Sequence, residues 1–337
     1  MYTLGIETSC DETSCSVLKD GDTILSNVIS SSLFRHKQFG GIVPEIASRH
    51  CLEQIETVFR ESLELAKIKP EDIDLIAVTE GPGLIGSLLV GISFAKAVAY
   101  RLKIPIIGVN HLEAHLAANF IGSKVPEKYV GLLVSGGHSI LSYHEKEKIK
   151  ILGSTVDDAV GEAYDKAAKL LGLSYPGGPV MDKLAGEGNP QVFRFTKPKQ
   201  ENPFAFSFSG IKTAVLYEVQ KQQKKNGNSL LESFVRDMAA SFQSSVVSWM
   251  VEKTLHAAEV MKVKHAAVGG GVSANSWLRK SLVEEGARRG VRVQFPERIL
   301  SLDNAAMIAR RGWELFKKGK KSGWNLTGLP NLKMGIK

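Results

Sequence analysis

Two histidines four residues apart, His111 and His115, carry the clearest chemical signal in the chain. They stand in the segment His-Leu-Glu-Ala-His, directly after an apolar stretch at 104–109 that we expect to be a buried strand. On a helix, positions i and i+4 share a face, so the two imidazoles could bind one divalent ion such as zinc or iron. Alternatively, they are only polar residues of the surface or the core. Their place at the carboxyl end of a strand, where open α/β sheets bind ligands, favours a site.

Small polar or glycine-rich turns follow three other predicted strands. Residues 7–13 separate strands at 2–6 and 14–18, and residues 135–139 separate strands at 129–134 and 140–143. Residues 269–275 join a strand at 265–268 to a helix. The backbone amides of such turns can hold phosphate, although a plain hairpin turn or a tight strand–helix turn would look similar. The repeated strand–turn–strand pattern indicates two similarly built lobes.

Two common nucleotide motifs are not expected here. Residues 81–86 spell GxGxxG between a predicted strand and a helix, but no acidic residue follows about 20 positions later, as a dinucleotide site requires. Close packing of the helix on the strand is the better explanation of these glycines. The sequence also contains no GxxxxGK[ST], which excludes a P-loop.

The bulk composition indicates a globular protein of the cytoplasm. The 337 residues are enough for one large or two smaller domains, and 43% of them are hydrophobic. There is no run of 18 apolar residues and no secretion signal at the N-terminus, so we expect no membrane association. Three cysteines do not make a disulfide framework. The formal net charge of +8 favours a polyanionic partner.

Three further segments allow more than one interpretation. Phe204–Ser209 alternates aromatic residues with serine and alanine, as a recognition segment or an edge strand would. Asp157 and Asp303 each precede a predicted helix and could serve as its N-cap. The basic run at 310–321 is either a solvated helix face or a polyanion-binding patch.

Several motifs occur together, in one order, and make a family resemblance specific. The chain resembles the bacterial tRNA N6-adenosine threonylcarbamoyltransferase family, once labelled a glycoprotease, of the actin, Hsp70 and sugar-kinase superfamily. The resemblance covers nearly the whole chain, without departure at the motif positions. The motifs are ETSCDET at 7–13, HLEAH at 111–115, LVSGGH at 133–138, GEAYDK at 161–166, YPGGP at 175–179 and GGGVSAN at 269–275.

The resemblance implies a fold and an activity. The fold would be a two-lobed α/β fold of the actin-like ATPase type, with a nucleotide and metal cleft between the lobes. Residues 1–110 would form the N-terminal lobe together with a C-terminal helix at 305–325, and residues 111–304 would form the lobe that carries the nucleotide-binding turns. The activity would be transfer of threonylcarbamoyl from threonylcarbamoyl-AMP to N6 of the adenosine 3′ to the anticodon, with release of AMP, in tRNAs that read codons beginning with A.

The same resemblance implies roles for individual residues. His111, His115 and Asp303 would bind one Fe²⁺ or Zn²⁺ ion. Asp11 and Glu12 would lie near the reacting group, with Asp11 as the candidate base. The adenylate, or an ATP/AMP-type ligand in the same cleft, would be held by Leu133, Val134, Ser135, Gly136, Gly137, Asp165, Gly178, Asp182 and Asn275.

The implied partners are tRNA, a paralogous actin-like subunit, a small P-loop ATPase of the same pathway and the upstream threonylcarbamoyl-AMP synthase. Two other functions stay open as alternatives. A metal-dependent peptidase of the HExxH type needs glutamate directly after the first histidine, where this chain has Leu112. Its glutamate is Glu113, which a helix would turn away from the histidine face. A nucleotide-gated scaffold or ATPase would keep the glycine turns without needing His111, His115 and Asp303.

Overall fold

The computed structural model describes residues 1–36, 39–227 and 229–335, and the chain forms two compact units. Unit 1 comprises Met1–Val125 with Pro296–Lys337, and unit 2 comprises Pro126–Phe295. Residues 111–125 and 296–304 therefore belong to unit 1, although the sequence analysis assigned them to the second lobe. The reason is local, because the histidine helix follows the last strand of unit 1 without a linker and packs on the C-terminal helix of that unit.

Unit 1 is built around a five-stranded sheet of order β3-β2-β1-β4-β5. The strands β1, β4 and β5 run parallel, and β1–β2–β3 form an antiparallel meander. Its elements are β1 (Tyr2–Glu7), β2 (Glu12–Lys19), β3 (Thr23–Ser31), α1 (Leu33–His36), α2 (Pro44–Ala66), η2 (Pro70–Asp72), β4 (Leu75–Gly81), α3 (Ile85–Leu102), β5 (Ile106–Asn110), α4 (His111–Ala117), η3 (Ala118–Phe120), α10 (Arg298–Ser301) and α11 (Ala305–Lys317).

The alternation of residues along the strands divides the core of unit 1 into two layers. On β4, Ile76 and Val78 belong to the core cluster beneath α2 and α3, whereas Leu75 and Ala77 belong to the cluster beneath α11. Successive side chains of a strand point to opposite faces, so one strand serves both layers. Helices thus cover both faces of the sheet, and the carboxyl ends of its parallel strands remain available for a site.

Unit 2 repeats this plan with the sheet order β10-β9-β6-β7-β8. Here β6–β7–β8 form the antiparallel meander, and β9 and β10 extend it in parallel, as β4 and β5 do in unit 1. Its elements are β6 (Lys128–Val134), β7 (Ser139–Glu145), β8 (Lys148–Ser154), α5 (Val160–Leu170), α6 (Gly177–Ala185), α7 (Ser209–Lys225), α8 (Glu232–Val260), β9 (His265–Gly269), η4 (Gly271–Ala274), α9 (Ser276–Arg288) and β10 (Arg292–Gln294). The expected repetition of strand–turn–strand is therefore part of a duplicated sheet topology.

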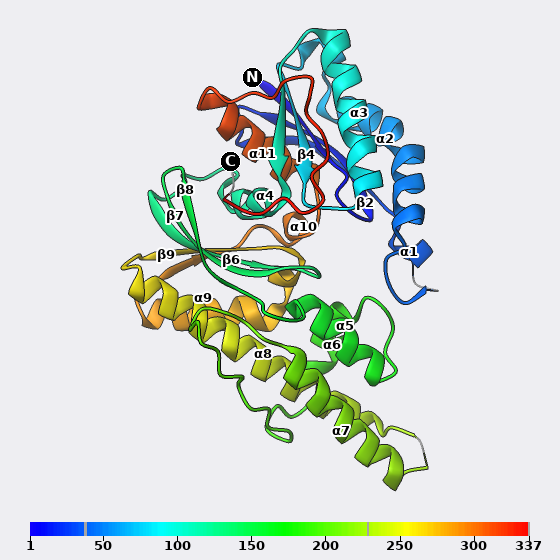
Figure 1. Cartoon of the computed structure of the whole chain (residues 1–337), viewed down its shortest axis with the longest axis vertical. Coiled ribbons are helices and arrows are strands. Elements are labelled where there is room, and N and C mark those ends of the chain that lie inside the picture. Colours follow the sequence, from blue (N-terminus) through cyan, green and yellow to red (C-terminus); the bar gives the residue numbers. More distant parts are fainter. Residues whose placement is uncertain (37–38, 228, 336–337) are drawn as a thin grey trace. The chain divides into compact units, whose positions relative to one another are not determined.

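The long helix α8 organises the core of unit 2 and packs against α6, α9 and β6 (Figure 1). The Phe204–Ser209 segment joins this core and does not form an edge strand, apart from one bridge between Phe206 and Thr155. Phe206 and Phe208 are buried. Asp157, a candidate cap of α5, instead accepts hydrogen bonds from Ser207, Phe208 and Ser209 and so holds this segment in place.

Helix α3 is, within the described ranges, the one helix long and apolar enough to cross a membrane by length and composition, with a mean hydropathy of 1.4. Its Leu88, Ile92 and Ala95 are buried in unit 1, where α3 packs on β4 and α2. This is the arrangement of a helix that covers a sheet, and core helices pass the same test of length and composition.

The close approach of α11 to β1 leads to a prediction about stability. A Cβ atom on Gly5 would collide with the backbone carbonyl of Ala305 and lie 2.8 Å from the backbone nitrogen of Ala309. We expect Gly5→Ala to lower the free energy of unfolding by about 1–3 kcal/mol, because the helix must move off the sheet. Urea denaturation measures the loss. Gly41→Ala, at a position with open surroundings, is the control, and an equal effect of both changes would contradict this account.

Candidate metal centre and nucleotide-binding turns

The helix α4 places both histidines of the HLEAH segment at the end of β5. It begins directly after the strand because Asn110 caps it, with the Asn110 side-chain oxygen accepting hydrogen bonds from the backbone N–H groups of Leu112 and Glu113. His111 and His115 then lie on one face of the helix, as their spacing predicts, with ring centroids 4.6 Å apart. Both residues are buried.

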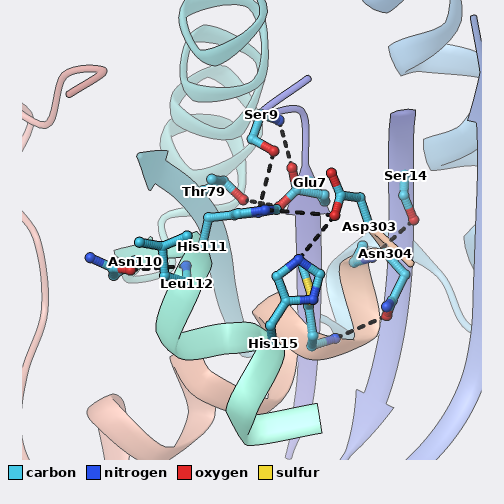
Figure 2. A network of polar contacts seen from close by, with 12 residues as sticks. Glu7, Ser9, Ser14, Thr79, Asn110, His111, Leu112, His115, Asp303 and Asn304 are labelled. Atoms are coloured by element: carbon cyan, nitrogen blue, oxygen red, sulfur yellow. Dashed lines mark hydrogen bonds and ion pairs between the residues drawn. The ribbon is translucent and has the colours of Figure 1, made fainter. Parts of the chain in front are cut away.

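Asp303 completes a three-residue cluster with these histidines (Figure 2). Its Oδ1 lies 3.0 Å from Nε2 of His115 and 3.6 Å from Nε2 of His111. Asp303 does not cap α11. That role belongs to Asn304, whose side chain accepts a hydrogen bond from the N–H of Met307. The cap therefore leaves the Asp303 carboxylate directed at the histidines.

His115 is unusual within this cluster. Both of its ring nitrogens are buried and neither makes a hydrogen bond, although Nε2 is close to the Asp303 carboxylate. A buried polar atom without a hydrogen-bond partner is costly. One candidate ligand atom from each of His111, His115 and Asp303 lies within 4.8 Å of the others, which a single cation could span.

Glu7 supports the other side of the His111 ring, and the sequence analysis gave it no role. Its Oε2 lies 3.0 Å from Nδ1 of His111 and also accepts a hydrogen bond from the Thr79 hydroxyl (Figure 2). Its Oε1 accepts a hydrogen bond from the backbone N–H of Ser9. A glutamate at the end of a buried strand could have indicated this role, because a fully buried carboxylate needs a hydrogen-bonding or charged partner.

Electrostatics links Glu7 and His111 as an ion pair. Burial alone would lower the pKa of His111, but the neighbouring carboxylates of Glu7 and Asp303 outweigh it and raise this pKa to about 9. Burial likewise would raise the pKa of Glu7, yet the charge and hydrogen bond of His111 hold it below its usual value. In the metal-free protein near pH 7, His111 is therefore an imidazolium between two carboxylates.

Asp11 and Glu12 lie in unit 1, where β1 turns into β2. The backbone carbonyl of Asp11 accepts a hydrogen bond from the N–H of Ser32, and Glu12 Oε1 accepts one from the Ser31 hydroxyl. Burial, with the charges of Asp11 and Asp303, raises the pKa of Glu12 well above its usual value. Burial also raises the pKa of Cys10, so this thiol is no candidate nucleophile.

Glu113 points away from the histidine face, as the helix geometry predicts. Its Oε2 forms an ion pair with Arg311 of α11 at 2.6 Å, and its Oε1 accepts a hydrogen bond from the N–H of Gly335. The C-terminal segment also reaches the cap of α4, where the Asn110 amide donates to the carbonyl oxygen of Lys333. Glu113 is thus a structural residue and does not lie where an HExxH peptidase has its catalytic glutamate.

In unit 2, the predicted turn after β6 lies against the start of α5. The Ser135 carbonyl accepts a hydrogen bond from the N–H of Gly161, and a Cβ on Gly161 would lie 2.7 Å from that carbonyl. Gly136 and Gly137 are exposed, and a Cβ on either would have no atom within 4 Å. By contrast, the side chains of Leu133 and Val134 are fully buried, which leaves only their backbone for any ligand.

Asp165, Gly178, Asp182 and Asn275 surround neighbouring helix ends in unit 2. Asp165 accepts a hydrogen bond from the N–H of Gly177, next to Gly178 at the start of α6. Asp182 accepts hydrogen bonds from the side chains of Gln243, Asn275 and Ser276 and from the N–H of Ser276. Asp182 therefore ties α6 to α8 and α9, so it shapes this region whatever else it contacts. No motif in the sequence marks Gln243, which contacts both Asp182 and Asn275.

The ion pair predicts a pH dependence of stability in the metal-free protein. The pKa of His111 is about 9 when folded, against an ordinary value of 6.5. The stabilisation is therefore fully present below pH 6.5 and is lost as the pH rises through about 9. We expect urea denaturation in the presence of a chelator to show falling stability from pH 6.5 to about 8.5, above which thiols of the unfolded chain ionise.

His111→Gln is the reference for this measurement, because it removes the titrating group but keeps a polar side chain. The stability of this variant should change less over the same pH range. If wild type and variant lost equal stability as the pH rises, another group would be responsible.

Comparison with known proteins gives a consistent family. A family model described as tRNA N6-adenosine threonylcarbamoyltransferase matches residues 23–310. A protein of that name from Thermosipho africanus is 50% identical over 337 residues, covering 99% of this chain and 100% of the relative. Another of that name, from Clostridium kluyveri, is 48% identical and covers 98% of this chain and 97% of the relative.

Solved structures agree on the fold. HypF, in a phosphate- and nucleotide-bound form, superposes with a TM-score of 0.62 at 14% identity over 96% of this chain, which spans about half (47%) of HypF. Component A of (R)-2-hydroxyglutaryl-CoA dehydratase from Acidaminococcus fermentans gives 0.53 at 17% identity over 95% of this chain and 100% of its own. These similarities confirm the predicted two-lobed fold of the actin-like ATPase type.

The full-length identities and the matched family model carry the assignment beyond the fold. The activity is transfer of a threonylcarbamoyl group to tRNA, as the sequence motifs predicted, and neither the peptidase nor the scaffold alternative is favoured. The chain belongs to the tRNA N6-adenosine threonylcarbamoyltransferase family.

Proposed function

We propose that the chain uses His111, His115 and Asp303 as the ligands of one Fe²⁺ or Zn²⁺ ion in transferring threonylcarbamoyl from threonylcarbamoyl-AMP to N6 of the adenosine 3′ to the anticodon. The substrates would be tRNAs that read codons beginning with A, and AMP would be released. The observation that supports this most directly is the buried cluster itself, in which Nε2 of both histidines faces the Asp303 carboxylate.

The donor set fits such an ion. Two imidazoles and one carboxylate form the ligand set of non-haem iron sites and of catalytic zinc sites, both of which keep positions for a substrate. An ion at the cluster would also give the buried His115 a partner for a ring nitrogen that makes no hydrogen bond. When bound, the ion would supply Lewis-acid polarisation of the carbamoyl carbonyl.

The glycine turn of unit 2 is suited to the adenylate. Neither Gly136 nor Gly137 has a positive φ, and neither would meet an atom within 4 Å if it carried a Cβ. The described fold therefore gives no reason for glycine at these positions. Close approach of a ligand to the backbone does, since backbone N–H groups and the start of α5 can bind phosphate. Asp165, Gly178, Asp182 and Asn275 would complete the binding region, with Leu133 and Val134 contributing backbone only.

The acids near β1 can manage the proton of the reaction. The N6 nitrogen bonds to the carbamoyl carbon, the bond from that carbon to the phosphate oxygen breaks, and AMP leaves with the electron pair. The attacking amine loses a proton, which Asp11 would accept. Glu12, whose pKa is raised by burial and by Asp11 and Asp303, favours its neutral form and can donate a hydrogen bond.

The proposal also names partners and a location. The net charge of +8 suits the phosphates of tRNA, and binding should weaken as salt rises. The paralogous actin-like subunit and the small P-loop ATPase would act with this chain, and the threonylcarbamoyl-AMP synthase would supply its substrate. We infer a cytoplasmic location from the tRNA substrate, and α3 would then cover the sheet of unit 1 and not span a membrane.

A reconstituted transfer assay tests the proposed function. The full chain, its partner proteins, the synthase, threonine, bicarbonate, ATP and unmodified tRNA are combined, and the modified nucleoside is measured by mass spectrometry. We expect product with wild type and a loss of at least about 100-fold with His115→Ala or Asp303→Asn, because each change removes a metal ligand.

Metal content measured on the same samples separates the possible causes. Wild type should bind one Fe²⁺ or Zn²⁺ ion tightly, and both variants should bind it weakly. Glu80→Gln, a carboxylate change in unit 1 outside the cluster, is the matched control and should keep both properties. Full transfer by Asp303→Asn without bound metal would refute the assigned role.

A second variant tests the glycine turn of unit 2. Gly137→Val should fold normally, because a Cβ at this position has open space. It should weaken binding of AMP or ATP by about 10-fold or more, because the side chain would keep phosphate away from the turn. Isothermal titration measures the affinity, and Gly210→Val, at another open glycine of unit 2, is the control. If Gly137→Val bound AMP or ATP as tightly as wild type, the nucleotide would not bind at this turn.

A further inference from the structure

We propose that Glu7 is the positioning residue of the metal centre, which holds the His111 ring with Nδ1–H toward Glu7 and the Nε2 lone pair toward the ion. The inference rests on the proposed function, because it assumes that His111 binds metal through Nε2. It adds a residue to which neither the motifs nor the proposed reaction gives a role.

Two contacts in unit 1, from Thr79 and Ser9, hold the Glu7 carboxylate beside the His111 ring (Figure 2). The Thr79 hydroxyl of β4 donates to Oε2 at 2.6 Å, and the Ser9 N–H in the turn after β1 donates to Oε1 at 2.5 Å. His111, at the end of β5, lies 3.0 Å from Oε2. The side chain is fully buried, so water does not compete for these contacts. The carboxylate is therefore held rigidly where three adjacent parallel strands end.

Glu7 contacts a different nitrogen of the His111 ring from the one that would bind the ion, so its role differs from that of a ligand. Glu7 contacts Nδ1, whereas Asp303 faces Nε2 of the same ring at 3.6 Å. The two nitrogens lie on different edges of the imidazole, so one ion cannot bind at Nε2 and also replace the contact at Nδ1. A carboxylate that accepts the proton of one ring nitrogen fixes the tautomer and increases the basicity of the other nitrogen.

Nearby groups do not duplicate this function. The Ser9 hydroxyl lies 3.2 Å from Nδ1 of His111, but a neutral hydroxyl can donate as well as accept and so does not select the tautomer. His115 has no hydrogen bond at either nitrogen. Of the two histidines, His111 is therefore the one whose orientation the protein sets before the ion arrives.

Metal affinity of Glu7→Gln tests the proposal on the full-length chain. Zn²⁺ or Co²⁺ alone is titrated against a chromogenic chelator, without substrates or partners. We expect affinity to fall about 10- to 100-fold, the usual effect of removing such a carboxylate. Thermal stability should fall as well, because the buried ion pair with His111 is lost. Glu80→Gln, which removes the same charge from unit 1 without contacting a histidine, should bind like wild type.

The outcomes distinguish this inference from the proposed function. If Glu7→Gln binds metal as tightly as wild type, while the His115→Ala variant does not bind it, then the inference is wrong and the proposed metal centre stands. If wild type binds no metal at the cluster, both are wrong. If Glu7→Gln and Glu80→Gln lost equal metal affinity, the cause would be the change in net charge, and the inference would be wrong.

A spectroscopic measurement on wild type covers the case in which Glu7→Gln does not fold. Nitrogen-15 spectra of histidine-labelled, zinc-loaded protein report which nitrogen of each ring carries a proton, and comparison with His111→Gln assigns the His111 signals. A protonated Nδ1 and a zinc-bound Nε2 on His111 support the proposal. Zinc on Nδ1, or an Nδ1 without a proton, overturns it.

Discussion

The packing of α11 on the first sheet is the contact on which the cluster of His111, His115 and Asp303 depends. Gly5 lets the backbone of the helix touch β1, and Gly312 brings its next turns against Ala77. Asp303 directly precedes Asn304, the residue that caps the first turn of α11. The position of Asp303 is thus set by helix–sheet packing, while the positions of the two histidines are set by a single turn of α4. Gly5 thus contributes to the position of Asp303, although it lies outside the cluster.

The charged side chains around the histidines form ion pairs with residues on other helices and strands. Glu7 and His111 neutralise each other within the sheet edge, and Glu113 on the opposite face of α4 pairs with Arg311 of α11. Each buried charge therefore has a counterpart on a different element, which offsets the cost of removing it from water. The same pairs join α4 to its neighbours on both of its faces, in addition to the packing of its buried Leu112, Ala114 and Leu116.

Much of the architecture was predictable, because local patterns determine it. The apolar strands at 2–6 and 129–134, the i and i+4 histidines and the repeated turns all follow from periodicity, and the structure contains each of them. The family motifs supplied Asp303, which no local pattern connects with His111. Contacts between distant segments were missed, among them Glu7 with His111 and Asp182 with Gln243, because tertiary packing alone brings them together. The grouping of residues 111–125 with unit 1 is another such long-range effect, since α4 packs on α11.

The division of unit 1 between both ends of the chain affects the order of events during synthesis. The first strands, the histidines and Glu7 leave the ribosome early, but Asp303 and α11 follow only after all of unit 2. Until α11 is made, the core cluster of Leu75, Ala77 and Ile107 lacks Met307 and Ile308, which complete it in the folded unit. The proposed three-ligand site can therefore form only after all of unit 2 has been synthesised.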